Sequence, residues 1–262
     1  MIGGLLFGYG MSLAGNCGFG ALARFGGGDL RSFVIVLVMG ISAYFMLSGP
    51  FATARVAFIA NTTMPTESFG YADLISSTTG VPVAFVGIIL AAGIGIAALS
   101  SRSFLGDTKS VIWACVVGLA ITSGWAGTQW IADTGFSTSP VISHTYTAPL
   151  GETLIFLMTA SGGGLSFGVG SVIGVLAGAF CGSLIKGHFR WEACDDPREL
   201  KRQFLGAMCM GFGAVLAVGC TIGQGVSAFS VLAFSAPITF AAIFAGAALG
   251  LRQLITGFAS TH

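Results

Sequence analysis

The sequence predicts an all-helical membrane protein that crosses the bilayer several times. Three observations predict this class: the composition, the long apolar runs and an internal repeat. Of 262 residues, 54% are hydrophobic and 8% are charged, whereas a soluble domain has about 25% charged residues. The mean hydropathy is +0.89. So few charged side chains do not cover a water-facing surface, which places the chain in a lipid bilayer. The net charge of +1 argues against a nucleic-acid partner.

Several apolar runs have the length that a bilayer requires, since about 20 helical residues cross the hydrocarbon core. These runs cover residues 32–49, 81–99, 111–131, 152–187 and 237–251. The run 152–187 is long enough for two segments, and Ser161-Gly-Gly-Gly164 divides it. We expect a short re-entrant helix there, followed by a full span. The more polar segment 50–79 is expected at or outside the membrane interface.

A glycine-rich segment around a single cysteine occurs twice. Residues 8–22 and 211–225 align with an offset of 203, and six of the fifteen positions are identical: two Gly, Leu, Ala, Cys and a later Gly. The aligned cysteines are Cys17 and Cys220. Glycine loosens a helix and allows other groups to approach its backbone. Each copy is therefore expected to be a helix that breaks at its cysteine and restarts after it.

Basic residues predict the orientation, because cytoplasmic loops carry an excess of Lys and Arg. Five of the eleven basic residues lie in the loop 186–202, which is therefore expected to face the cytoplasm. The loop 100–110, Arg24 and Arg31 are expected on the same side, and the loop 132–151, which has no Lys or Arg, on the outside.

With this orientation, the two motif copies cross the membrane in opposite directions. The chain is thus predicted to be a single transmembrane domain, residues 1–262, with an inverted repeat whose copies lie around 1–49 and 204–251. In such repeats, paired broken helices meet near the midplane of the bilayer.

Both copies also resemble motifs of a known family. The run Phe7-Gly-Tyr-Gly-Met-Ser-Leu-Ala-Gly-Asn-Cys17-Gly-Phe-Gly-Ala-Leu-Ala-Arg24, followed by Gly26 and Gly28, resembles the first glycine–cysteine motif of the YeeE/YedE (sulphur transport) membrane proteins. Met210-Gly-Phe-Gly-Ala-Val-Leu-Ala-Val-Gly-Cys220-Thr-Ile-Gly-Gln-Gly-Val-Ser227 resembles the C-terminal motif of that family more closely still. The resemblance implies import of a small sulphur compound, with thiosulfate as the substrate, and motif cysteines that hand the anion along at a central constriction. It further implies a location in a bacterial-type cytoplasmic (inner) membrane and a cytoplasmic sulphur-carrier protein as partner.

Two features depart from the family pattern. Family members usually begin with a further apolar segment that carries another cysteine, upstream of where this chain starts. In addition, Cys209 stands where the family more often has an aliphatic residue, so no functional role is assigned to it.

The chemistry of a cysteine between glycines suits a sulphur anion. A thiol in an apolar site stays neutral and offers a weak S–H donor and a polarisable sulphur. A helix break at each cysteine exposes N–H groups of the following half-helix, and helix N-termini bind anions without a cationic side chain. The predicted permeation residues are Cys17, Cys220, Gly15, Asn16, Gly18, Gly219, Thr221 and Gly223, and Arg24 is a candidate for attracting anions to the pore mouth.

Other functions remain as alternatives. Cys115, Cys181, Cys194 and Cys209 are interpreted as small apolar residues of membrane helices. The motif copies contain no Asp or Glu, which argues against a proton relay. No residue spacing indicates a metal site, and no cofactor motif is visible.

The leading hypothesis is a transporter or channel without enzymatic activity. The alternatives are a membrane sulphur-transfer or thiol-redox protein that uses Cys17 and Cys220 as a thiol pair, and a pore subunit that needs a partner.

Overall fold

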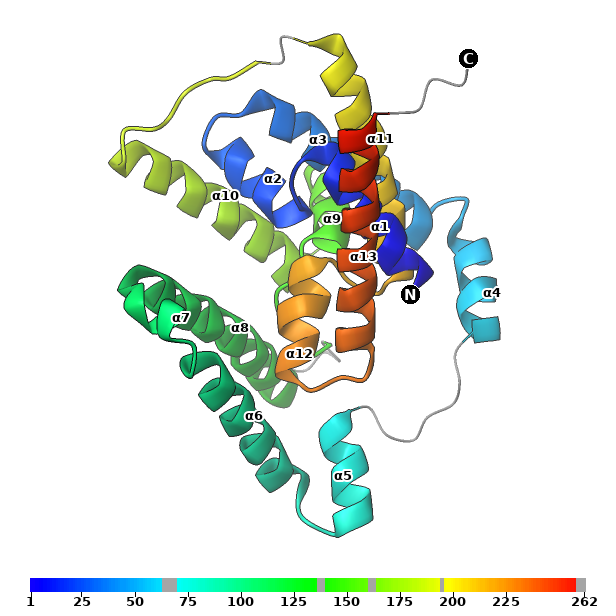
Figure 1. Cartoon of the computed structure of the whole chain (residues 1–262). Coiled ribbons are helices and arrows are strands. Elements are labelled where there is room, and N and C mark those ends of the chain that lie inside the picture. Colours follow the sequence, from blue (N-terminus) through cyan, green and yellow to red (C-terminus); the bar gives the residue numbers. More distant parts are fainter. Residues whose placement is uncertain (63–69, 136–139, 160–163, 194–195, 258–262) are drawn as a thin grey trace. The chain divides into compact units, whose positions relative to one another are not determined.

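The computed structural model describes residues 1–62, 70–135, 140–159, 164–193 and 196–257 (Figure 1). Throughout these ranges the regular secondary structure is helical and no strand forms, which confirms the all-α prediction. Among the described residues, four helices are long and apolar enough to cross a membrane: α3 (Leu30–Leu47), α8 (Thr108–Thr134), α10 (Phe167–Ile185) and α13 (Ser235–Thr256). The chain is therefore a polytopic helical membrane protein, as predicted.

The chain divides into two compact units. The first consists of Met1–Thr63, Thr145–Gly225 and Pro237–His262, and the second of Met64–His144 and Val226–Ala236. Both motif cysteines belong to the first unit. Residues 161–163 of the predicted glycine break at 161–164, and Cys194, lie outside the described residues.

The first unit is built around α11 (Pro197–Leu216), which packs against α1 (Ile2–Ala14), α3 and α9 (Thr147–Met158). The shorter α2 (Gly18–Gly26) packs against α3 and α10, and α4 (Ala52–Thr62) follows α3. The centre of the unit is apolar and fully buried, and its largest side chains include Phe7, Leu22, Ile35, Met39, Met210 and Ile243. Burial of this apolar core holds the elements that carry the two cysteine motifs.

Local capping explains where two of these helices begin. The carboxylate of Asp29 accepts hydrogen bonds from the backbone N–H of Arg31 (3.0 Å) and the hydroxyl of Ser32 (2.9 Å) at the start of α3. The carboxylate of Asp196 accepts from the N–H of Arg198 (2.8 Å) at the start of α11. The cap at Asp196 and the proline at the first helical position, Pro197, both favour a helix start at this point. Helix α11 therefore begins before the apolar run at Phe204, and its first turns are charged.

In the second unit, α5 (Tyr71–Thr79), α6 (Val83–Leu99), α7 (Arg102–Gly106), α8 and the short α12 (Ala228–Ser230) are the regular elements. The extended residues 140–144 lie along α8, where the hydroxyl of Ser143 donates to the carbonyl of Ile121 (2.9 Å) and that of Thr128 to Ile142 (2.8 Å). The segment 50–79, expected at the membrane interface, therefore contributes a helix to each unit, α4 and α5.

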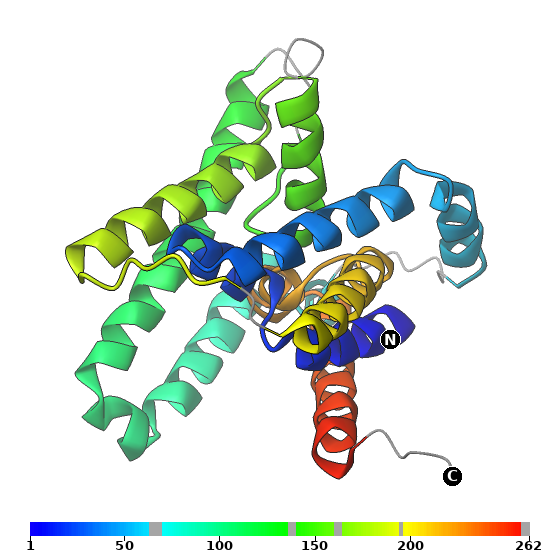
Figure 2. The ribbon, with the colours of Figure 1, turned by 90° about the horizontal axis from the view of Figure 1, so that it is seen from above.

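Helices α1 and α11 lie side by side, with their backbones in direct contact (Figures 1 and 2). A Cβ atom on Gly10 would lie 2.5 Å from the carbonyl oxygen of Gly206, and one on Gly3 would lie 2.7 Å from that of Gly213. Contacts this short leave no room for a side chain. The glycines of both motif copies thus allow the close helix packing that is common in membranes.

These glycine contacts are reciprocal. Gly3 and Gly206 are separated by 203 residues, as are Gly10 and Gly213, the same offset that relates the two motifs. Gly3 approaches Gly213, and Gly10 approaches Gly206, so the equivalent positions exchange partners and the two helices run antiparallel. An exchange of partners between equivalent positions is the contact pattern that a two-fold axis produces.

The adjacent helices follow the same rule. Gly8 of α1 approaches the backbone of Ile243 in α13. Its equivalent in the second copy, Gly211 of α11, approaches Met39 and Ala43 of α3. In each copy, the helix before the cysteine therefore packs against the long helix that follows the cysteine of the other copy.

Gly206→Ala is expected to lower the free energy of unfolding by about 1–3 kcal/mol, the usual cost of overpacking, because the added Cβ would lie 2.7 Å from the backbone of Gly10 and Ala14. Gly178→Ala in α10 is the matched control, since no atom lies within 4 Å of its added methyl group. That variant is expected to be unchanged or stabilised by up to about 1 kcal/mol, because Ala favours a helix over Gly. Thermal unfolding of both purified variants tests this, and equal stability would contradict the close approach of α1 and α11.

Candidate permeation site

The first motif places Cys17 between two helices. Helix α1 ends at Ala14, and Gly15 closes it with a positive φ of 81°, a conformation that favours glycine. Cys17 is the N-cap of α2, and its Sγ accepts the backbone N–H of Gly20 at 3.4 Å. The sulphur therefore lies over the first turn of α2, where unpaired N–H groups give a helix its partial positive charge.

The second motif has the same local geometry. Helix α11 ends at Leu216, and the chain turns through Val218, whose positive φ of 55° is unusual for a β-branched residue. Cys220 follows, and its Sγ accepts the backbone N–H of Gly223 at 3.5 Å. The next turns form a π-helix, Gly223–Ser227. Both cysteines thus contact the N–H three residues ahead, and each stands at a break between helices.

The two cysteines differ in exposure. Cys220 is 1% exposed and belongs to the apolar core with Met39 and Tyr146. Cys17 is half-buried. Both are free thiols in the structure. Any ligand that contacts Cys220 must therefore lose its hydration shell, whereas Cys17 is partly exposed to solvent.

A third segment, which the sequence did not point to, contacts both motifs. The Oγ1 of Thr145 lies 3.7 Å from the Sγ of Cys220. The ring of Tyr146 packs against that of Phe19 in α2, with centroids 5.0 Å apart. Thr147 is 1% exposed, and its Oγ1 would lie 3.8 Å from a Cβ on Gly18. The residues 145–147, expected in an outer loop, are therefore part of the core of the first unit, between the two cysteine motifs.

Unpartnered polar atoms gather at these segments. Among the described residues, the buried side-chain atoms there without a hydrogen-bond partner are Asn16 Oδ1, Thr147 Oγ1, Thr221 Oγ1 and Gln224 Oε1. Asn16 and Thr221 are the direct neighbours of the two cysteines. Buried polar groups in native proteins almost always have a partner, so such a group of atoms is typical of a place that water or a polar ligand occupies.

Gln224 also stabilises the second helix break. Its Nε2 donates hydrogen bonds to the carbonyl oxygens of Ala217 and Val218, both at 3.0 Å. These carbonyls belong to the end of α11, where the helix no longer supplies partners. The side chain is 4% exposed. Its carbonyl oxygen remains without a protein partner.

The remaining predicted residues divide into two groups. Gly15, Gly18, Gly219 and Gly223 lie at the two breaks, as their places in the motifs require. Arg24 is exposed in the last turn of α2, away from the first turn that Cys17 caps. Cys115 on α8 and Cys181 on α10 are exposed.

Together, the fold and these breaks define a polytopic helical membrane protein with polar groups buried between half-helices, an architecture typical of transport proteins. The chain belongs to the sulphur transport family, whose model matches residues 1–249. It is 28% identical over 243 residues to the thiosulfate transporter TsuA of Spirochaeta thermophila, a match that covers 90% of this chain and 71% of that protein. It is 26% identical over 244 residues to the thiosulfate transporter TsuA of Escherichia coli, which covers 86% of this chain and 66% of that protein. The chain therefore spans about two thirds of the length of these relatives.

Proposed function

We propose that the chain conducts a small sulphur-containing anion, thiosulfate, across the membrane past Cys17 and Cys220. The observation that carries the proposal is the shared geometry of the two cysteines, each with its sulphur over the N–H groups of a half-helix. The names of the two relatives, both thiosulfate transporters, support this choice of substrate. The proposed function is transport without chemical conversion.

The site provides hydrogen-bond donors without a cationic side chain. The hydroxyls of Thr147 and Thr221, unpartnered in the structure, donate to the oxygen atoms of the anion. The N–H groups at the start of α2 contribute positive potential, and the thiols contact the terminal sulphur through polarisable, weakly donating surfaces. Contacts of this kind are replaceable, which suits conduction because a tightly held ion does not leave.

The reciprocal glycine contacts support an inverted repeat. Helices α1 and α11 are equivalent, antiparallel and in contact through exchanged positions. Under this proposal, a pseudo-two-fold axis passes between them and brings the two cysteine breaks together near the midplane. Each half-helix would then approach the permeating anion from the opposite side of the membrane.

Uptake of radiolabelled thiosulfate into proteoliposomes tests the proposed function. The purified chain, in vesicles that contain no oxidant or reductant, is expected to accumulate label down a thiosulfate gradient. A thiol-redox or sulphur-transfer protein would instead require a co-reactant for turnover. Absence of uptake from vesicles with correctly folded protein would contradict conduction by this chain alone and would favour a subunit that needs a partner.

We also propose that the loop 186–202 faces the cytoplasm of a bacterial-type cell, because it carries five of the eleven basic residues. A cytoplasmic sulphur-carrier protein, as the family resemblance implies, would then receive the sulphur compound on that side. A cysteine introduced in this loop at the exposed Arg198, in a variant whose six native cysteines are replaced by Ser, is expected to resist a membrane-impermeant maleimide in intact cells. The same cysteine should react once the membrane is permeabilised. Labelling of intact cells would reverse the proposed orientation.

A further inference from the structure

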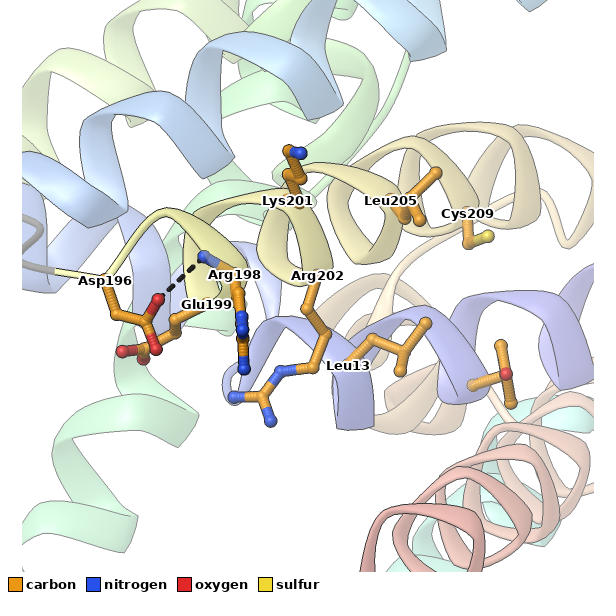
Figure 3. A pocket seen from close by; sticks show the side chains of 9 residues that line it. Leu13, Asp196, Arg198, Glu199, Lys201, Arg202, Leu205 and Cys209 are labelled. Atoms are coloured by element: carbon orange, nitrogen blue, oxygen red, sulfur yellow. Dashed lines mark hydrogen bonds between the residues drawn. The ribbon is translucent and has the colours of Figure 1, made fainter. Parts of the chain in front are cut away.

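A pocket of about 740 Å³ opens between α1 and the first half of α11 (Figure 3). Its lining residues are Tyr9, Leu13, Asp196, Arg198, Glu199, Lys201, Arg202, Leu205 and Cys209. None of them belongs to the proposed permeation site. One water molecule occupies about 30 Å³ in the liquid, so the volume of the pocket corresponds to roughly 25 water molecules. The pocket is therefore far larger than a small inorganic anion needs.

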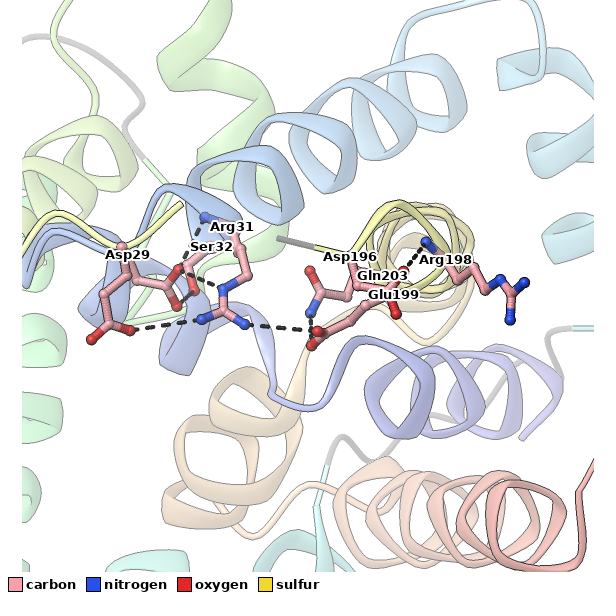
Figure 4. Close-up of polar contacts among 8 residues, drawn as sticks. Asp29, Arg31, Ser32, Asp196, Arg198, Glu199 and Gln203 are labelled. Atoms are coloured by element: carbon pink, nitrogen blue, oxygen red, sulfur yellow. Dashed lines mark hydrogen bonds and ion pairs between the residues drawn. The ribbon is translucent and has the colours of Figure 1, made fainter. Parts of the chain in front are cut away.

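One end of the pocket carries an excess of positive charge, because Arg198, Lys201 and Arg202 line it together with only two carboxylates, Asp196 and Glu199. Arg198 and Arg202 are four residues apart on α11 and extend from the same side of this helix in Figure 3. The carboxylates nearby are already engaged (Figure 4): Asp196 caps α11, while Glu199 accepts from Gln203 and pairs with Arg31 at 3.7 Å. Among the described residues, no carboxylate forms an ion pair with Arg198 or Arg202, and the buried Nε of Arg202 has no hydrogen-bond partner.

The other end of the pocket is apolar. Leu13 of α1, Leu205 and Cys209 line it, and Leu205 is 57% exposed. The wall of the pocket thus changes from charged to apolar between Arg202 and Cys209, less than two turns of the same helix. A membrane shows the same change between its headgroup layer and its hydrocarbon core.

We propose that this pocket binds an anionic phospholipid. The lipid phosphate lies against the guanidinium groups of Arg198 and Arg202, which match phosphate geometry bidentately, and an acyl chain follows Leu13 and Leu205. Basic pockets beside membrane helices bind anionic headgroups through such contacts. A free inorganic anion could also bind the two arginines, but it would make no contact with the apolar end of the pocket. The lipid holds α1 against α11, the helices that carry both cysteine motifs.

Native mass spectrometry of the purified protein with phosphatidylglycerol tests the proposal. Wild-type protein is expected to retain phosphatidylglycerol in preference to phosphatidylcholine. The double variant Arg198→Gln, Arg202→Gln should bind it roughly 30-fold more weakly, if each arginine in contact with the lipid phosphate contributes about fivefold. The matched control is Lys186→Gln, Arg190→Gln, which removes two exposed charges from the same loop outside the pocket and should bind phosphatidylglycerol as the wild type does.

Cys209 provides a second readout that needs no charge variant. Its half-buried thiol lines the pocket, so its alkylation, followed by peptide mass spectrometry, should slow when phosphatidylglycerol is added. The exposed Cys115 of the other unit is the internal control and should react at an unchanged rate. Three results would each overturn the proposal. The two double variants could bind phosphatidylglycerol equally well, or the wild type could retain phosphatidylcholine as well as phosphatidylglycerol. Inorganic phosphate at the same concentration as the lipid could also displace it.

Discussion

Cys220→Ala is expected to abolish thiosulfate uptake while the protein still folds and inserts. The side chain is 1% exposed, and its Sγ contacts both the N–H of Gly223 and the hydroxyl of Thr145. Truncation removes the polarisable sulphur and the S–H donor from a fully buried point of the site. The loss of a capping acceptor costs about 1 kcal/mol, a small part of the stability of a folded domain.

Cys220→Ser separates the two contributions of the thiol. Serine keeps a donor and is a better N-cap acceptor than cysteine, but it lacks the soft sulphur surface. Uptake by the Ser variant would show that the site supplies hydrogen bonding, and loss of uptake would show that the sulphur contact is required. Cys17→Ala is expected to reduce uptake similarly. Cys115→Ala, an exposed site in the second unit, is the control and should transport normally.

Thr147→Val is expected to weaken transport and stabilise the fold at the same time. The Oγ1 of Thr147 is buried without a protein partner, and while no anion or water is bound there such a group costs about 1–3 kcal/mol. Valine has nearly the same shape and removes this cost, so the unfolding midpoint should rise. The same change removes a donor to the anion, and a hydrogen bond to a charged group is worth about 1.5–3 kcal/mol. Uptake should therefore fall at least tenfold, as measured by the initial rate in proteoliposomes.

The control for this variant lies on the same helix. Thr153 is also buried, but its hydroxyl already donates to the carbonyl of Pro149 at 2.6 Å. Thr153→Val should lose a little stability and keep normal uptake. If Thr147→Val transports normally, the hydroxyl of Thr147 does not bind the anion in the wild type. If both variants lose uptake equally, the effect comes from the packing of α9 rather than from the site.

The helix breaks could be predicted from sequence because their cause is local. Glycine on either side of Cys17 and Cys220 permits the turns that end one helix and start the next, and the structure has a break at each cysteine. The apolar runs likewise predicted the long helices, since burial in lipid depends on composition over about 20 residues. The family resemblance, which rested on the same two motifs, is confirmed over residues 1–249.

The rest of the site depends on contacts that no local pattern reveals. Thr145 lies 75 residues from Cys220 and follows a polar stretch that resembles an outer loop. Only the packing of α9 against α3 and α10 brings residues 145–147 between the motifs. The start of α11 at Pro197 was missed for another reason, because hydropathy does not detect a charged helical turn that is held by its cap.

The central claim is that thiosulfate passes between the two cysteine breaks. The most direct test is anomalous diffraction from crystals of the protein grown with thiosulfate, measured at a wavelength where sulphur scatters. The account predicts added sulphur density in van der Waals contact with the Sγ of Cys220 and next to Thr147, and loss of that density in Cys220→Ala crystals. If the protein transports thiosulfate but the added sulphur density lies elsewhere, with none beside Cys17 or Cys220, the central claim is contradicted.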